Sequence, residues 1–195
     1  NKSNVEINKK DGVILINFKD NYEGSLKLLF DLNKEFKDKI LINIGKKCNV
    51  TIAEEKVKGN SDCDNEFEIR LGENSILNYV EIQNLNEVIN NVRKNIYCSE
   101  NSYVLRQLIC LGSKSTKYDV NVYLEENSKA NDIELFFGDK EQKFELHTNL
   151  IHKGQNSNGN VIVKGVLKDK AYCNSHGILR INKEAQNTNT FLAEH

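Results

Sequence analysis

The sequence predicts an all-β protein, a right-handed parallel β-helix whose repeats of about 26 residues contain two strands each. In several segments apolar and polar residues alternate strictly, which is typical of strands with one buried face. The triplet Glu-Asn-Ser recurs before such segments at intervals of 27 and 26 residues. Hairpin signals of the competing antiparallel sandwich are nearly absent, because the one Asp-Gly pair, Asp11-Gly12, follows no convincing strand.

The first 40 residues are the least regular part of the chain. A helical spacing occurs there in one apolar set: Leu26, Leu28, Leu29, Leu32 and Phe36. The segment SLKLLF over residues 25–30 also alternates in period two, and we interpret it as a strand.

The three triplets end at Ser75, Ser102 and Ser128, and each supplies turn residues between two apolar runs. Stepping back 27 residues from Ser75 reaches Cys48, which opens the strand-like run NVTIAEE. Stepping forward from Ser128 reaches Asn156-Ser157 before NGNVIVKGV. We therefore expect the triplets to stack at one corner of the β-helix, with inward Asn side chains forming ladders at the turns.

The strands between the triplets place alternate side chains in the predicted core. These side chains are Phe67, Ile69 and Leu71, then Tyr118, Val120, Val122 and Leu124, then Phe144, Leu146, Thr148 and Leu150. A two-strand repeat cannot bury this face alone, so successive repeats must stack to form a continuous core.

Composition limits the function classes. The 195 residues (22.3 kDa) suit a single domain over 1–195, and the formal charge of −1 argues against nucleic-acid and anionic-membrane partners. No apolar run is long enough for a membrane span, and no secretory signal opens the chain, so we expect a cytoplasmic protein. The cysteines lack metal-binding spacing and are expected to be free, mostly buried thiols: Cys48, Cys63, Cys98, Cys110 and Cys173.

A metal site has weak candidates only. Cys173 and His176 form C-x-x-H, but a spacing of three in a strand puts the two side chains on opposite faces. By the same parity His147 points outward and His152 inward, and we interpret both as structural histidines.

Catalytic signatures are missing from the sequence. There is no P-loop for ATP hydrolysis and no G-x-S-x-G nucleophile elbow. The adjacent carboxylates Glu54-Glu55 and Glu125-Glu126 face opposite ways in a strand, and we interpret them as solvated turns rather than acid–base pairs. No catalytic residue and no cofactor is assigned to the chain, which we expect not to be an enzyme.

The segment 144–192 resembles the core domain of the SufB/SufD family of iron–sulfur cluster assembly proteins. The matching residues are the H-T-x-x-x-H of His147, Thr148 and His152, the K-G-V-L of Lys164–Leu167, the G-x-x-x-I strand at Gly177, and the A-Q-x-T of Ala185, Gln186 and Thr188. Upstream, the order of strands from about residue 40 is also similar to that family. The strand YDVNVYL looks more like SufD than SufB, because a sulfur-accepting cysteine often found in SufB-type members is here replaced by the run Val120-Asn121-Val122.

The resemblance implies a parallel β-helix and a non-catalytic scaffold role in the SUF machinery. Such proteins act with the SufC ATPase and a SufB- or SufD-type subunit, or as homodimers, and an iron–sulfur cluster is implied for the assembled complex. In the family the SufC-docking region lies C-terminal to the segment matched here, so we expect a domain cut short at its C-terminus, and residues 1–195 alone not to bind SufC. The run Asn187–Leu192 is expected to be either an edge strand paired across a two-fold contact or locally disordered. The alternative is a carbohydrate-active or surface β-helix resembling polysaccharide lyases.

Overall fold

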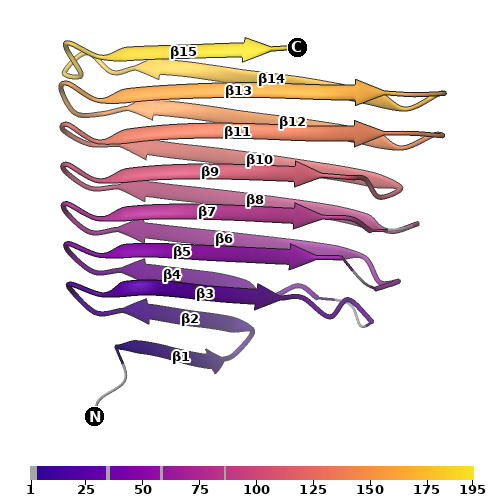
Figure 1. Ribbon diagram of the computed structural model, residues 1–195, viewed down its shortest axis with the longest axis horizontal. Coiled ribbons are helices and arrows are strands. Elements are labelled where there is room, and N and C mark those ends of the chain that lie inside the picture. The colour runs from indigo at the N-terminus through magenta and orange to yellow at the C-terminus, as the bar shows by residue number, and fades with distance from the viewer. Residues whose placement is uncertain (1–3, 34–35, 58, 86) are drawn as a thin grey trace.

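The computed structural model describes residues 4–33, 36–57, 59–85 and 87–195, which form a flattened β-solenoid (Figure 1). The strands are β1 (Val5–Lys10), β2 (Val13–Phe18), β3 (Glu23–Leu29), β4 (Lys39–Ile44), β5 (Asn49–Lys56), β6 (Cys63–Leu71), β7 (Ile76–Gln83), β8 (Ile89–Cys98), β9 (Tyr103–Cys110), β10 (Ser115–Leu124), β11 (Lys129–Gly138), β12 (Lys143–His152), β13 (Asn158–Leu167), β14 (Tyr172–Ile181) and β15 (Asn189–Glu194). The described part of the chain contains no helix that could span a membrane.

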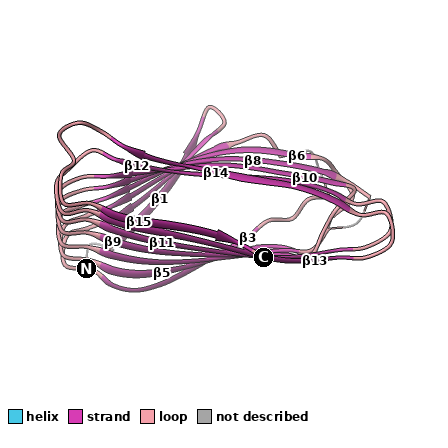
Figure 2. Cartoon of the chain, turned by 90° about the horizontal axis from the view of Figure 1, so that it is seen from above, coloured by secondary structure: helices cyan, strands magenta, loops and turns pink. Residues whose placement is uncertain are grey.

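Two sheets face each other across the core (Figure 2). Sheet A has the order β1-β2-β4-β6-β8-β10-β12-β14, and sheet B has the order β15-β13-β11-β9-β7-β5-β3. From β2 onward every pairing is parallel, as for Lys39 with Glu66. In Figure 1 the sheet B strands run rightward in front, the sheet A strands run leftward behind, and successive turns rise, which makes the coil right-handed. The predicted right-handed parallel β-helix is therefore confirmed.

Residues 25–30, which combine a helical spacing with strand-like alternation, belong mostly to the strand β3. β3 carries Leu26 and Leu28 toward the core, whereas Leu29 is exposed, as period-two alternation requires. Leu32, beyond the strand, is fully buried in a small cluster with Cys63.

The N-terminal hairpin differs from the sequence prediction. Asp11-Gly12 does follow a strand, because β1 pairs antiparallel with β2 through this turn. Both turn residues have positive φ, 50° and 76° respectively. β1 is almost wholly exposed: Val5 and Ile7 alternate with Glu6 and Asn8, but this run is short and buries no continuous face.

The triplets stack at one corner, as predicted. Ser102 and Ser128 are buried, and each hydroxyl donates to the backbone carbonyl three residues earlier, at 2.7 Å. Ser75 bonds across the rungs instead, donating to the Gly45 carbonyl at 2.6 Å. Cys48 takes the equivalent place one turn earlier, because the residues that follow, Asn49 and Ile76, share a register position, and its backbone N–H donates to the Ser75 hydroxyl at 3.0 Å.

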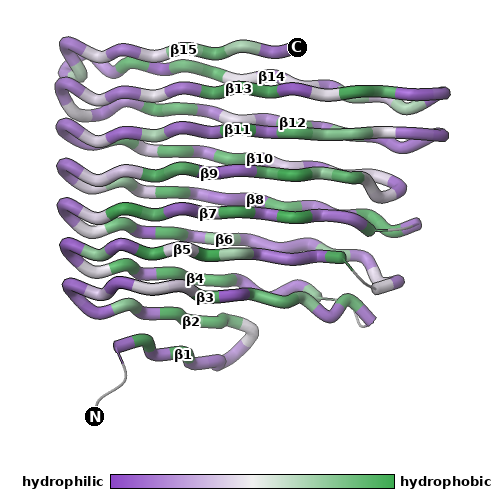
Figure 3. Tube along the Cα trace, viewed as in Figure 1, coloured by the Kyte–Doolittle hydropathy of each residue, from purple (hydrophilic) through white to green (hydrophobic). Residues whose placement is uncertain are grey.

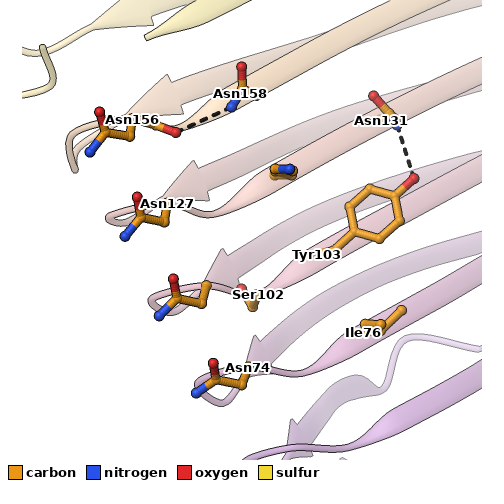
Figure 4. A pocket seen from close by; sticks show the side chains of 10 residues that line it. Asn74, Ile76, Ser102, Tyr103, Asn127, Asn131, Asn156 and Asn158 are labelled. Atoms are coloured by element: carbon orange, nitrogen blue, oxygen red, sulfur yellow. Dashed lines mark hydrogen bonds between the residues drawn. The ribbon is translucent and has the colours of Figure 1, made fainter. Parts of the chain in front are cut away.

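The corner asparagines adopt the left-handed conformation and line an open groove (Figure 4). Asn74, Asn101 and Asn127 have φ between 56° and 58°, a region that Asn tolerates better than other residues with a Cβ. The predicted inward ladders are wrong, because these side chains project outward. Asparagine ladders occur instead on the outer sheet faces, where Asn149 donates to Asn121 at 3.0 Å.

The core lies between the inner faces of the two sheets. Hydrophobic and hydrophilic residues alternate along the strands, as Figure 3 shows. The predicted inward residues of β6, β10 and β12 are all buried. The fold therefore follows from period-two alternation combined with a turn that recurs about every 27 residues.

We predict that Asn127→Ala destabilises the protein by about 1 kcal/mol, because alanine is strained at positive φ. Asn127→Gly is the matched control and should change the free energy of unfolding little, because glycine has no such strain. Urea unfolding of both variants measures this. Equal stabilities of the Ala and Gly variants would show that the corner conformation imposes no cost.

Candidate functional site inside the solenoid

A network of charged side chains fills the middle of the core. Its charged members are almost completely buried: Glu54, Lys56, Glu81, Lys94, Arg106, Asp132 and Glu134. All project from sheet B except Lys94, which comes from β8 in sheet A. The interpretation of Glu54 as a solvated residue is wrong. Glu54 lies on the same strand face as the buried Val50 and Ile52. The alternation of this strand predicts a buried position, but the charge of Glu54 led to the opposite interpretation.

Lys94 joins the two sheets at one end of this network. Its Nζ lies 2.6 Å from Glu54 Oε2 and 2.9 Å from Glu81 Oε2. The same ammonium sits 3.7 Å from the centroid of the Phe67 ring, a cation–π contact. Tyr79 donates its hydroxyl hydrogen to Glu54, so this carboxylate accepts from two buried donors.

Arg106 organises the other end and contacts three carboxylates. Its Nε donates to Glu81 at 2.6 Å, and its Nη1 donates to both oxygens of Asp132 at 2.9 and 3.0 Å. Nη1 also lies 2.8 Å from Glu134 Oε1. Thr148, the threonine of the H-T-x-x-x-H motif, donates to the same Glu134 oxygen at 2.7 Å, so the network reaches β12 of sheet A.

The network holds four carboxyl groups and three cations among the residues described above. Burial raises the pKa of Asp132 to about 7, although Arg106 opposes the shift. Burial acts on Glu54 in the same direction, but Lys94 and Lys56 outweigh it and lower its pKa to about 2. Asp132 can therefore hold or release a proton near neutral pH, whereas Glu54 stays ionised there.

Burial dominates the pKa shifts of the thiols, and it raises the pKa of Cys63 although the neighbouring Lys56 opposes the shift. Burial raises the pKa of Cys98 and of Cys110 to about 12, and that of Cys173 to about 11. All five cysteines are free, as predicted, and all but the half-buried Cys173 are buried. A thiolate is the nucleophile and the metal ligand, so these pKa values disfavour both roles.

The histidines separate by face as their parity predicts. His152 is buried, with its Nδ1 2.8 Å from the Ser157 hydroxyl at the corner. His147 faces outward, with its Nδ1 2.9 Å from Asp119 Oδ1. Cys173 and His176 lie on opposite faces of β14, so the structure does not bring them together. Among the described residues no group of three or more His, Cys, Asp or Glu side chains could hold a metal ion.

Several motif residues are explained by close packing between rungs. A Cβ on Gly165 of the K-G-V-L motif would lie 2.0 Å from the Phe136 ring, so only glycine fits beneath that ring. A Cβ on Gly177 would lie 2.4 Å from a methyl carbon of Leu192. Thr188 of the A-Q-x-T motif donates to the Ala185 carbonyl at 3.0 Å and continues the corner column.

We predict that Asp132→Asn flattens the dependence of stability on pH between about pH 4 and about pH 7. The folded pKa of Asp132 is raised above its unfolded value, so its stabilising contribution is complete at low pH and is lost as pH rises through about 7. The variant should therefore gain stability relative to the wild type as pH rises. Urea unfolding across this range, with the exposed Asp169→Asn as control, measures it. A variant curve parallel to the wild type would contradict the assignment.

We also predict slow alkylation of Cys98 and Cys110 in the folded protein. A free thiol has a pKa of about 8.5, so at mildly alkaline pH these two cysteines carry far less thiolate than an unfolded chain. Iodoacetamide labelling read by peptide mass spectrometry, before and after denaturation, gives the ratio. Labelling of either cysteine in the folded protein at the unfolded rate would refute the prediction.

Comparison with known protein families agrees with the resemblance that the motif residues of the sequence indicate. No curated protein sequence matches the chain significantly. Residues 31–195 match the protein family described as "SUF system FeS cluster assembly, SufBD core domain". The match covers the solenoid from Asp31 onward, including the charged network and the corner column. The chain therefore belongs to the SufBD core domain family of the SUF system for iron–sulfur cluster assembly.

Proposed function

We propose that the chain is a non-catalytic scaffold subunit of the SUF machinery that acts with the SufC ATPase and a SufB- or SufD-type subunit. The non-catalytic part of this proposal rests on one observation: the buried ionisable groups form ion pairs with one another. Arg106 contacts three carboxylates and Lys94 contacts two, and burial raises the pKa of the Cys98 and Cys110 thiols to about 12. Such groups hold rungs together and have no access to a substrate.

The proposed role is closer to SufD than to SufB. The outer position between the buried Val120 and Val122 is Asn121, which takes part in an asparagine ladder, and it offers no thiol for a persulfide. The cluster is proposed to be held by the assembled complex rather than by this chain. The reduced state of the cysteines is consistent with a cytoplasmic location. The family match gives no support to the carbohydrate-active alternative.

The proposed contact for the Suf-type partner is the edge of β15 that faces away from β13. Backbone bonds from Asn189 and His195 point to β13, so the alternate residues Thr190 and Leu192 direct their N–H groups to the other side. Among the described strands none pairs with that side. The strand is ordered, so the disordered outcome expected for 187–192 is wrong, and pairing of this edge across a two-fold contact stays a prediction. An unpaired edge is a template for a strand of another chain.

We predict that Thr190→Pro abolishes capture of the partner, because proline removes the N–H that faces away from β13. Thr190→Val is the matched control, since both variants lose the hydroxyl bond to the Gly159 carbonyl but valine keeps the N–H. Co-purification of a SufB-type subunit with the tagged chain measures capture, and circular dichroism verifies folding.

Capture by the wild type and by Thr190→Val, but not by Thr190→Pro, is the expected result. Equal capture by both variants would show that the partner does not use this edge. Absence of the SufB-type subunit with the wild-type chain would contradict the scaffold role itself.

A further inference from the structure

Three residues far apart in the sequence form a column on the outer face of sheet A. Asp119 of β10, His147 of β12 and His176 of β14 occupy the same register position on neighbouring parallel strands. The ring centroids of the two histidines are 4.1 Å apart, with the ring planes inclined by 47°. The sequence suggested Cys173 as the partner of His176. In the structure His176 lies instead beside His147, 29 residues earlier in the chain.

We propose that His147 and His176 together bind one divalent transition-metal ion of the kind that prefers imidazole, such as Zn²⁺, Ni²⁺ or Cu²⁺. Asp119 is a carboxylate and can only accept, so the His147 Nδ1, 2.9 Å away, carries the hydrogen of this contact. In the neutral ring Nε2 then presents its lone pair. A carboxylate behind one ring nitrogen of a metal-binding histidine is the usual arrangement in proteins, because it fixes the tautomer and raises ligand basicity.

The free nitrogen of His147 has no other use in the structure. His147 Nε2 is buried and has no hydrogen-bond partner, which carries a free-energy cost that a metal bond would remove. The neighbouring His176 is exposed, so its ring can turn on the surface without disturbing the core. Zinc–nitrogen bonds are about 2.0–2.1 Å long, so one ion can join two nitrogens about 3 Å apart. Histidine rings at equal register on adjacent strands, with centroids 4.1 Å apart, can meet that requirement.

The surroundings define an open site. No third His, Cys, Asp or Glu completes a cluster among the described residues, so water or a ligand from a partner would occupy the remaining positions. The charges that face Asp119 are the ammonium of Lys117, 3.8 Å away, and Arg93 in the same register position. Lys117 is also paired with Glu145, and Arg93 is paired with Asp64, so both cations are partly neutralised. This site is separate from the buried network and does not depend on the proposed scaffold role.

Titration calorimetry of the whole chain with Ni²⁺ and with Zn²⁺, at a pH where imidazole is neutral, tests the proposal. The variants are His147→Ala, His176→Ala and Asp119→Asn, with His195→Ala and Cys173→Ser as controls that keep the column. We expect one ion per chain, loss of that binding in both column-histidine variants, and affinity about 10–100-fold weaker in Asp119→Asn. The exposed position of His176 makes its variant the one that folds with least disturbance.

Cu²⁺ binding followed by electron paramagnetic resonance gives a second readout, because two nitrogen ligands leave a characteristic hyperfine pattern. Nitrogen coupling that disappears in a folded His176→Ala variant supports the site. Binding that is unchanged in His176→Ala, or that is lost instead in Cys173→Ser, overturns the proposal. Failure of the wild type to bind any of the three ions more tightly than His147→Ala also overturns it.

Discussion

The in-register parallel ladder of backbone hydrogen bonds is the constraint on which the rest of the structure depends. Each turn must bring the chain back beside itself, so residues 26 to 31 positions apart share one register position, as Ile14 with Ile40 and Asn158 with Asn189. Side chains at equal register stack into columns whatever their chemistry. The corner hydroxyls, the asparagine ladders and the Asp119–His147–His176 column are all products of this one repetition. Differences in turn length are absorbed in the loops, which leaves the ladder intact.

The same repetition places charge inside the core and makes that charge tolerable. Buried ion pairs add little net stability, but removal of one partner leaves an uncompensated charge and typically costs about 3–5 kcal/mol. Stacking sets Arg106 beside Asp132 and between the rungs that carry Glu81 and Glu134, so its donors meet acceptors on both sides. Lys94 reaches from the opposite sheet, and the network thereby fixes the distance between the two sheets. The network contains one more carboxyl group than cations, and the pKa of Asp132 is raised to about 7.

The sequence contained the fold but only part of the site. Period-two alternation and the Glu-Asn-Ser triplets were sufficient for the corner and for the buried faces, because both are local patterns. The strand β1 was missed because it buries no face, and Glu54 was misassigned because a charge outweighed the parity of its strand. The contact between His147 and His176 could not be predicted, since it depends on a 29-residue interval set by turn lengths that no local pattern encodes.

The most direct test of this account is a register-specific disulfide between neighbouring turns. Asn95 and Asn121 are partners on the outer face of sheet A, and cysteines on adjacent strands at equal register lie within the distance that a disulfide spans. The variant Asn95→Cys/Asn121→Cys should form this bond under mild oxidation, as mapped by peptide mass spectrometry, whereas Asn95→Cys/Tyr123→Cys, displaced by two residues, should link poorly. Preferential linkage of the displaced pair, or of neither pair, would contradict the parallel in-register solenoid.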